Sequence, residues 1–221
     1  MSLPEHTIIR SSRRTFSLEI TPDAKLLVRA PRWALSSTIE NILRERESWI
    51  QSRLQKVSVH LQHAPQKTLI SGDTIFFLGE RISVFFIAGK QKPFHEKGML
   101  FVGEIGDSKM LIEDWYRKQM KILLPEKIAG YAQAIGKSPS SFRVTGAEKR
   151  WGSCSSTGNL NFSWRLCMAP EWVIDYVVAH ETAHLLEMNH SSRFWKHVEH
   201  LFPCFREAKH WLKEHGFLLQ W

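Results

Sequence analysis

The stretch VVAHETAHLLEMNH, residues 177–190, places three histidines and two glutamates at the end of an apolar run. An α-helix turns by about 100° per residue, so His180 and His184 share one helix face and can bind one ion. Glu181 follows the first of these histidines and can lie beside an open coordination position without being a ligand. This HExxH pattern predicts a zinc site that activates water, with two ligands and a carboxylate base on one helical turn.

A catalytic zinc needs a third protein ligand, and two residues are candidates. His190 lies six residues after His184, among Asn and Ser residues that commonly end helices. If the chain turns after Met188, His190 can swing back and complete a three-histidine set. Glu187 is the alternative, but a side chain three positions beyond His184 can point past the ion, so we favour His190. The spacing HExxHx5H is also that of the metzincins, which carry glycine where Glu187 stands.

The residues around this motif predict a mixture of strands and helices. Residues 109–136 are expected to be helical, with Pro125 as a break or as the start of a second helix. The last third of the chain, from residue 169, is expected to be mainly helical. Between these regions lie three expected short strands: SFRVTG (141–146), RWGSCSS (150–156) and NLNFSWRL (159–166).

The first part of the chain predicts strands and one helix. Residues 15–20 and 25–31 alternate apolar and polar side chains, as in a hairpin with one buried face. Residues 36–56 have the apolar spacing of an amphipathic helix, and residues 68–89 return to strands. A polar, glycine-containing stretch from about 90 to 108 suggests a boundary. We therefore expect an α+β protein, with a β-rich N-terminal region at 1–105 and a catalytic domain at 106–221.

Composition and the lengths of the apolar stretches bear on the cellular compartment and the partners of the protein. The N-terminus lacks the sustained apolar core of a secretory signal, and no apolar stretch is long enough to cross a bilayer, so we expect a cytoplasmic protein without membrane contact. The three cysteines form no CxxC pair, which argues against a disulfide framework or a thiolate zinc site. The net charge of +8 makes an anionic partner, such as a nucleotide or a nucleic acid, possible.

Two motifs together resemble a known family. RWGSCSS (150–156) and VVAHETAHLLEMNHSSRFW (177–195) are similar to the YgjP-like metallopeptidases, relatives of the WLM and SprT-type zincins. The likeness extends to the N-terminal strands and to the closing HWLKEHG, so it covers nearly the whole chain. It implies a zincin-like domain behind a small β-rich region, one zinc ion per chain, and a peptide or protein substrate. It also implies the ligands His180, His184 and His190, and Glu181 as general base. The family usually has leucine where Thr182 stands.

The expected chemistry follows from the ion. Zinc lowers the pKa of a bound water to around 7, and Glu181 would accept its proton as the water attacks a carbonyl. Arg150 is a candidate contact to the transition state or the substrate, with a surface salt bridge as the alternative. Trp151 and Trp164 could line the cleft or pack in the core. Zinc suits three imidazoles, although nickel, cobalt or manganese can occupy the same ligands.

Three functions are consistent with such a site. The first is a zinc metallopeptidase, which the resemblance favours. The second is a metal-dependent hydrolase of nucleotide phosphoanhydrides, which would use arginines to hold phosphates but has no phosphate-binding glycine loop. The third is a nucleic-acid-binding module stabilised by zinc, in which Glu181 would have no evident role. The sequence therefore predicts a zinc-dependent hydrolase, with the peptidase as the preferred form.

Overall fold

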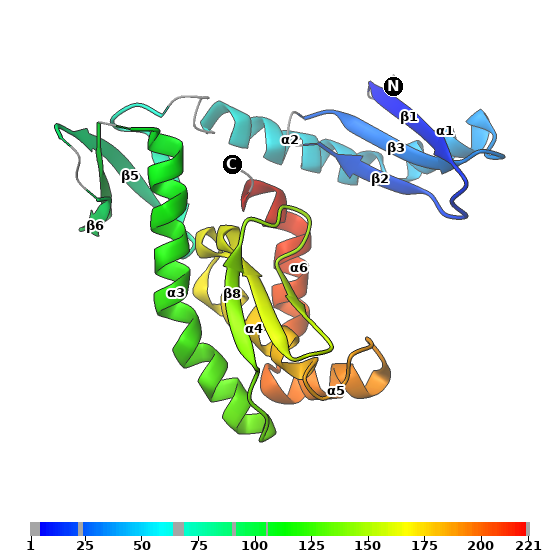
Figure 1. Ribbon diagram of the computed structural model, residues 1–221. Coiled ribbons are helices and arrows are strands. Elements are labelled where there is room, and N and C mark those ends of the chain that lie inside the picture. Colours follow the sequence, from blue (N-terminus) through cyan, green and yellow to red (C-terminus); the bar gives the residue numbers. More distant parts are fainter. Residues whose placement is uncertain (1–4, 22–23, 64–68, 90–91, 105, 220–221) are drawn as a thin grey trace. The chain divides into compact units, whose positions relative to one another are not determined.

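The computed structural model describes residues 5–21, 24–63, 69–89, 92–104 and 106–219 (Figure 1). Its helices and small mixed sheets make the fold α+β, as the sequence predicts. The chain forms two compact units, Met1–Ala64 and Pro65–Trp221. Within the described residues, no helix is both long and apolar enough to cross a membrane.

The first unit contains a three-stranded sheet in the order β1-β3-β2. Strands β2 (Ser17–Ile20) and β3 (Leu26–Pro31) pair antiparallel, which confirms the predicted hairpin. Strand β1 (His6–Ser11), which was not predicted, pairs parallel with the other side of β3. The alternating residues Leu26 and Val28 of β3 are buried, because this strand lies in the centre of the sheet.

Two helices follow where the sequence predicts one. Helix α1 (Ser36–Glu45) and helix α2 (Glu47–His63) are separated at Arg46, whose φ of −104° and ψ of 11° are not helical. The apolar spacing continues through this break: Ile39, Leu43 and Ile50 are buried in one core with the strands of the unit. Burial of this face keeps both helices on the sheet, so the periodicity alone could not reveal the break.

The second unit begins with a four-stranded sheet in the order β4-β5-β7-β6. Its strands are β4 (Thr74–Phe77), β5 (Glu80–Ile87), β6 (Phe94–Glu96) and β7 (Met99–Gly103). Leu78 and Gly79, with φ of 50° and 87°, form the two-residue turn between β4 and β5. A Cβ atom on Gly79 would lie 2.9 Å from atoms of Pro170. The turn therefore packs closely against Pro170, which precedes helix α4 (Glu171–Ala183).

The two compact units divide between Ala64 and Pro65, whereas the sequence predicts a boundary near residue 105. The expected polar boundary contains two strands, and β7 pairs in parallel with β5. Leu100 and Val102 of β7 are fully buried in the same core as the helices of the second unit. These alternating apolar residues attach the four-stranded sheet to the part of the chain that carries the histidine motif.

A single long helix, α3 (Ser108–Ile135), replaces the two expected around Pro125. Asp107 caps its start by accepting hydrogen bonds from the backbone of Lys109 and Met110, and Gly136 ends it with a φ of 66°. The apolar face continues past the proline, with residues four apart all buried: Tyr116, Met120, Leu124, Ile128 and Ala132. This continuous buried face explains why the helix persists through Pro125.

The second sheet of this unit has the order β8-β10-β9 and lies beside α3 (Figure 1). Strands β8 (Ser141–Thr145), β9 (Gly152–Cys154) and β10 (Asn159–Ser163) confirm the three predicted strands. A short helix η1 (Trp164–Met168) leads into α4 (Glu171–Ala183), and α5 (Ser192–Leu201), α6 (Phe205–His215) and η2 (Gly216–Leu219) complete the unit. Leu160 and Phe162 of β10 are buried in the core that α4 shares.

Candidate metal centre and active site

Helix α4 carries His180, and His184 follows its last residue. Its apolar residues, including Val177 and Val178, are buried and hold the helix in the core. The helix ends at Ala183 with His184 as its C-cap, rather than near Met188 as the sequence predicts. The backbone N–H groups of Leu185 and Leu186 donate to carbonyls three residues earlier, which tightens the last turn and redirects the chain.

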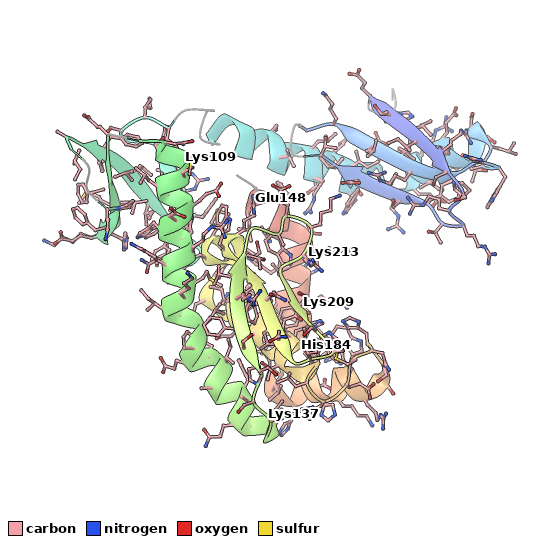
Figure 2. All side chains as sticks on the ribbon, viewed as in Figure 1. Lys109, Lys137, Glu148, His184, Lys209 and Lys213 are labelled. Atoms are coloured by element: carbon pink, nitrogen blue, oxygen red, sulfur yellow. The ribbon has the colours of Figure 1, made fainter. Side chains whose placement is uncertain are left out.

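This early turn brings three histidines together. The side-chain nitrogens of His180, His184 and His190 that could bind an ion all lie within 4.8 Å of one another. His180 Nε2 lies 3.1 Å from His190 Nε2. Figure 2 marks the place of this cluster by its label on His184. Three imidazoles at such separations form a donor set of the kind that holds zinc or a similar divalent cation.

The protonation states of His180 and His184 are also compatible with binding a metal cation. His184 Nδ1 donates to the Glu187 backbone carbonyl at 3.0 Å, which leaves the Nε2 lone pair for an ion. Burial, with the neighbouring charges of His184, His190 and Lys209, lowers the pKa of His180 to about 3. Burial also lowers the pKa of His184. Both rings are therefore neutral at physiological pH, the form in which imidazole binds metals.

Glu187, the alternative third ligand, forms an ion pair with Arg193. Its carboxylate lies 3.0 Å from the guanidinium of Arg193, and its backbone carbonyl accepts from His184. The turn after Ala183 removes Glu187 from the helical face on which it was expected. The structure thus brings His190, and not Glu187, next to the first two histidines.

Aromatic side chains of α5 support the cluster and were not predicted as part of it. Phe194 is fully buried, and its ring centre lies 4.3 Å from that of His184 and 4.9 Å from that of His180. Trp195 packs beside His180, and the ammonium of Lys209 lies over the indole of Trp195. His180 Nδ1 is buried without a hydrogen-bond partner among the described residues. The orientation of this ring therefore depends on aromatic packing.

Glu181 is buried beside the edge strand β9. It is 5% exposed, and a Cβ atom added to Gly152 would lie 2.6 Å from its Cγ and Oε1 atoms. Burial raises the pKa of Glu181 to about 8, although the charge of Arg150 acts in the opposite direction. A divalent cation close to this carboxyl would lower its pKa, because positive charge favours the ionised form. Because Gly152 has no side chain, the Glu181 carboxyl has room beside β9.

Replacing Gly152 with alanine is expected to lower kcat by about a hundredfold, because the added methyl group must displace the Glu181 carboxyl. The bound metal per chain should not change, since Gly152 touches none of the three histidines in the contacts described. Steady-state kinetics and metal analysis measure the two effects. Gly130→Ala is the matched control, because a Cβ atom there meets nothing within 4 Å. Equal activity of Gly152→Ala and wild type would contradict the steric role.

The remaining predicted residues have separate environments. Arg150 is exposed, and its charge acts on Glu181. Trp164 is fully buried and stacks on Tyr116, so it belongs to the core, whereas Trp151 lines a small cavity beside β9. Thr182 is fully buried, and its hydroxyl has no hydrogen-bond partner among the described residues.

Within the described part of the chain, the cysteines and the remaining histidines are not part of the three-histidine cluster. The cysteines are free, but only Cys167 is fully buried; Cys154 is partly buried and Cys204 is exposed. Of the histidines on the last helices, His200 and His210 are exposed. His215 instead packs on Trp211 and bonds to its backbone carbonyl.

Comparison with known proteins shows the family to which the chain belongs. A family model described as YgjP-like, metallopeptidase domain, matches residues 14–215, and the chain belongs to this family. The solved structure of the metallopeptidase zymogen abylysin from Pyrococcus abyssi is 24% identical to the chain over the aligned part, with a TM-score of 0.36. That alignment covers 39% of this chain and 86% of the abylysin chain. None of the curated proteins compared with the chain matches it.

Family membership identifies the protein as a metal-dependent peptidase, as the sequence predicts. The family implies a divalent cation and a peptide or protein substrate. The three-histidine cluster is a suitable place for that cation within the described residues.

Proposed function

We propose that the protein is a zinc peptidase in which His180, His184 and His190 hold the ion and Glu181 is the general base. Arg150 is proposed to contact the substrate. The observation that supports this most is that side-chain nitrogens of the three histidines lie within 4.8 Å of one another. The buried carboxyl of Glu181 belongs to the residue that follows the first of them. When bound, zinc polarises a carbonyl oxygen and makes a nearby water acidic enough to lose a proton at neutral pH.

The chain's own residues supply the remaining functions. Glu181 accepts a proton from the attacking water and can pass it to the departing amine. Burial of this carboxyl beside Gly152 restricts its movement, so that it stays in position for this transfer. Phe194 and Trp195 exclude water from one side of the histidines and limit rotation of the rings.

A peptide substrate can bind along β9. This strand is at the edge of its sheet, since β10 is the central strand, and its outer side pairs with no other described strand. β9 also packs against α4, which carries Glu181. An extended peptide that adds to this edge by main-chain hydrogen bonds would pass beside the carboxyl and the histidines. The neighbouring strand β10 pairs with β8 on one side and with β9 on the other, so it does not offer a free edge.

Removal and return of the metal tests the proposal. The purified chain is treated with a chelator, dialysed, and assayed against a peptide mixture after addition of single metals. We expect zinc to restore cleavage at about one ion per chain, cobalt to substitute for it, and magnesium to have no effect, because imidazole donors suit the first two ions. Recovery with magnesium alone would contradict a three-histidine site. Cleavage by the fully chelated chain would contradict metal dependence.

A further inference from the structure

A cavity of about 210 Å³ lies on the second sheet next to the edge strand. Its wall consists of residues from β8, β9, β10 and the loop between β8 and β9: Thr145, Ala147, Arg150, Trp151, Gly152, Ser153, Asn161 and Ser163. Gly152 also lies next to Glu181, so the cavity and the proposed base have this residue of the short strand β9 in common. A substrate that runs along β9 would therefore pass the mouth of the cavity.

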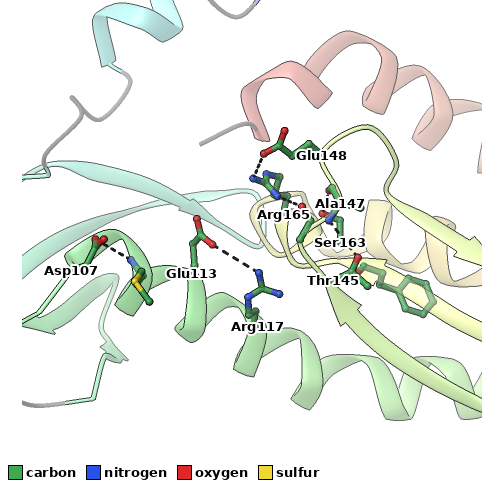
Figure 3. A network of polar contacts seen from close by, with 11 residues as sticks. Asp107, Glu113, Arg117, Thr145, Ala147, Glu148, Ser163 and Arg165 are labelled. Atoms are coloured by element: carbon green, nitrogen blue, oxygen red, sulfur yellow. Dashed lines mark hydrogen bonds and ion pairs between the residues drawn. The ribbon is translucent and has the colours of Figure 1, made fainter.

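Hydrogen bonds from Arg165 and Ser163 fix the loop between β8 and β9 (Figure 3). Arg165, which is almost fully buried, donates to the Gly146 carbonyl at 3.0 Å and to Glu148 at 3.3 Å. The Ser163 hydroxyl donates to the Ala147 carbonyl at 2.7 Å. Its backbone N–H donates to the Trp151 carbonyl at 2.8 Å. These bonds fix both ends of the loop, so the cavity is preformed and does not depend on the substrate for its shape.

Two side chains that line the cavity, Arg150 and Ser153, offer hydrogen-bond donors, and the side-chain oxygen of Asn161 is an acceptor. The hydroxyls of Thr145 and Ser163 are bonded to backbone carbonyls. Ser153 Oγ accepts from Asn161 Nδ2 at 3.3 Å, which leaves the hydroxyl proton of Ser153 available. Arg150 brings a guanidinium with several N–H donors. No aspartate or glutamate is among the described residues that line the cavity. This combination favours a negatively charged acceptor.

Size and surroundings narrow the choice of ligand. The volume is below the 300 to 1,000 Å³, roughly, of pockets that hold a whole drug-sized ligand, so one side chain or one chain end fits better than a nucleotide. Other cations lie near the proposed site: the charge of Lys209 acts on His180, and Lys137 bonds to the Leu185 carbonyl. Lys209 and Lys137 therefore add positive charge around the proposed metal site.

We propose that this cavity binds a carboxylate of the peptide substrate, held by Arg150 and Ser153, and that it gives the peptidase a preference for cleavage beside an acidic group. The carboxylate can belong to an aspartate or glutamate side chain or to the C-terminus of the peptide. The inference rests on the proposed peptidase site and adds the substrate class to it.

The test compares matched peptides on the full, zinc-loaded chain. A mixture of acetylated and amidated peptides with all residue types, analysed by mass spectrometry, first identifies the cleaved bonds. Peptide pairs that differ only in Glu or Gln at the selected position then give kcat/KM. We expect the Glu peptide to exceed the Gln peptide by at least about tenfold, the worth of one charge-assisted hydrogen bond. Arg150→Gln should bring the ratio close to one, whereas Lys149→Gln, an exposed neighbour outside the cavity, should keep it.

A second set of peptides separates the two sources of the carboxylate. Peptides with a free C-terminus are compared with their amides. Preference for the free acid, with cleavage near the chain end, assigns the cavity to the C-terminus. Preference for Glu in amidated peptides assigns it to a side chain. Equal cleavage in both comparisons would overturn the proposal.

Two further outcomes distinguish this inference from the proposed function. If Arg150→Gln slows Glu and Gln peptides equally and keeps their ratio, Arg150 acts on the reacting group and the cavity proposal fails, although the peptidase site stands. Calorimetric binding of the Glu and Gln peptides to the Glu181→Gln chain gives a readout that needs no turnover. A Kd ratio near one there would also overturn the carboxylate site. Full activity of Glu181→Gln would instead refute the proposed base without affecting the cavity.

Discussion

Replacing Glu181 with glutamine is expected to lower kcat by about 10² to 10⁴, the usual contribution of a general base. Glutamine keeps the size of the side chain but has no basic oxygen that could accept a proton at neutral pH. Bound metal should stay at the wild-type level, because Glu181 is outside the group of three histidine nitrogens. Activity and metal content of the same preparation, measured by peptide cleavage and elemental analysis, give both results.

The fold should tolerate this change. Glu181 is 5% exposed and packs against Gly152, so a residue of nearly equal shape fits the same space. A neutral amide also avoids the cost of a buried charge. The control is Glu199→Gln, which removes an exposed carboxylate on α5 that pairs with Arg206. We expect the control to be as active as wild type. Turnover by Glu181→Gln within about threefold of wild type would exclude Glu181 as the base.

The helical part of the site could be predicted because it depends on local geometry alone. His180 and His184 share a helix face at a spacing of four, whatever else surrounds them. The position of His190 depends on where the chain turns. Leu185 and Leu186 continue the apolar pattern and suggest more helix, but their N–H groups bond three residues back and end it at Ala183. The sequence therefore indicated the favoured third histidine but placed the turn too late.

Other parts of the site depend on contacts between distant residues, which periodicity does not encode. Gly152 and Glu181 meet only because β9 packs on α4. Phe194 approaches the histidines because α5 folds back after the turn. The RWGSCSS motif singled out the right segment, but its strand pattern did not reveal a glycine that makes room for a carboxyl. Similarly, the apolar residues Leu100 and Val102 are buried in the core of the second unit, although the polar residues before them suggested a boundary.

The choice of third ligand leads to the other large expected effect. His190→Ala should weaken metal binding by at least about a hundredfold, since loss of a residue that only orients a ligand already costs 10- to 100-fold. Glu187→Gln should bind metal as wild type does, because the Glu187 carboxylate pairs with Arg193 and the interaction with His184 uses the Glu187 backbone carbonyl. Competition with a chromophoric zinc chelator measures both affinities on metal-free protein.

Because His190 is exposed, this comparison separates an effect on zinc affinity from an effect on folding. An exposed side chain contributes little to packing, so the metal-free His190→Ala chain should have a Tm close to that of metal-free wild type. The Glu187–Arg193 pair is also solvent-accessible at the arginine, which is 80% exposed, and is worth at most about 1 kcal/mol. Any large loss of zinc affinity in either variant therefore reports on the ion site and not on folding. If Glu187→Gln lost the metal while His190→Ala kept it, the ligand set would have to be His180, His184 and Glu187, with a turn that differs from the one described.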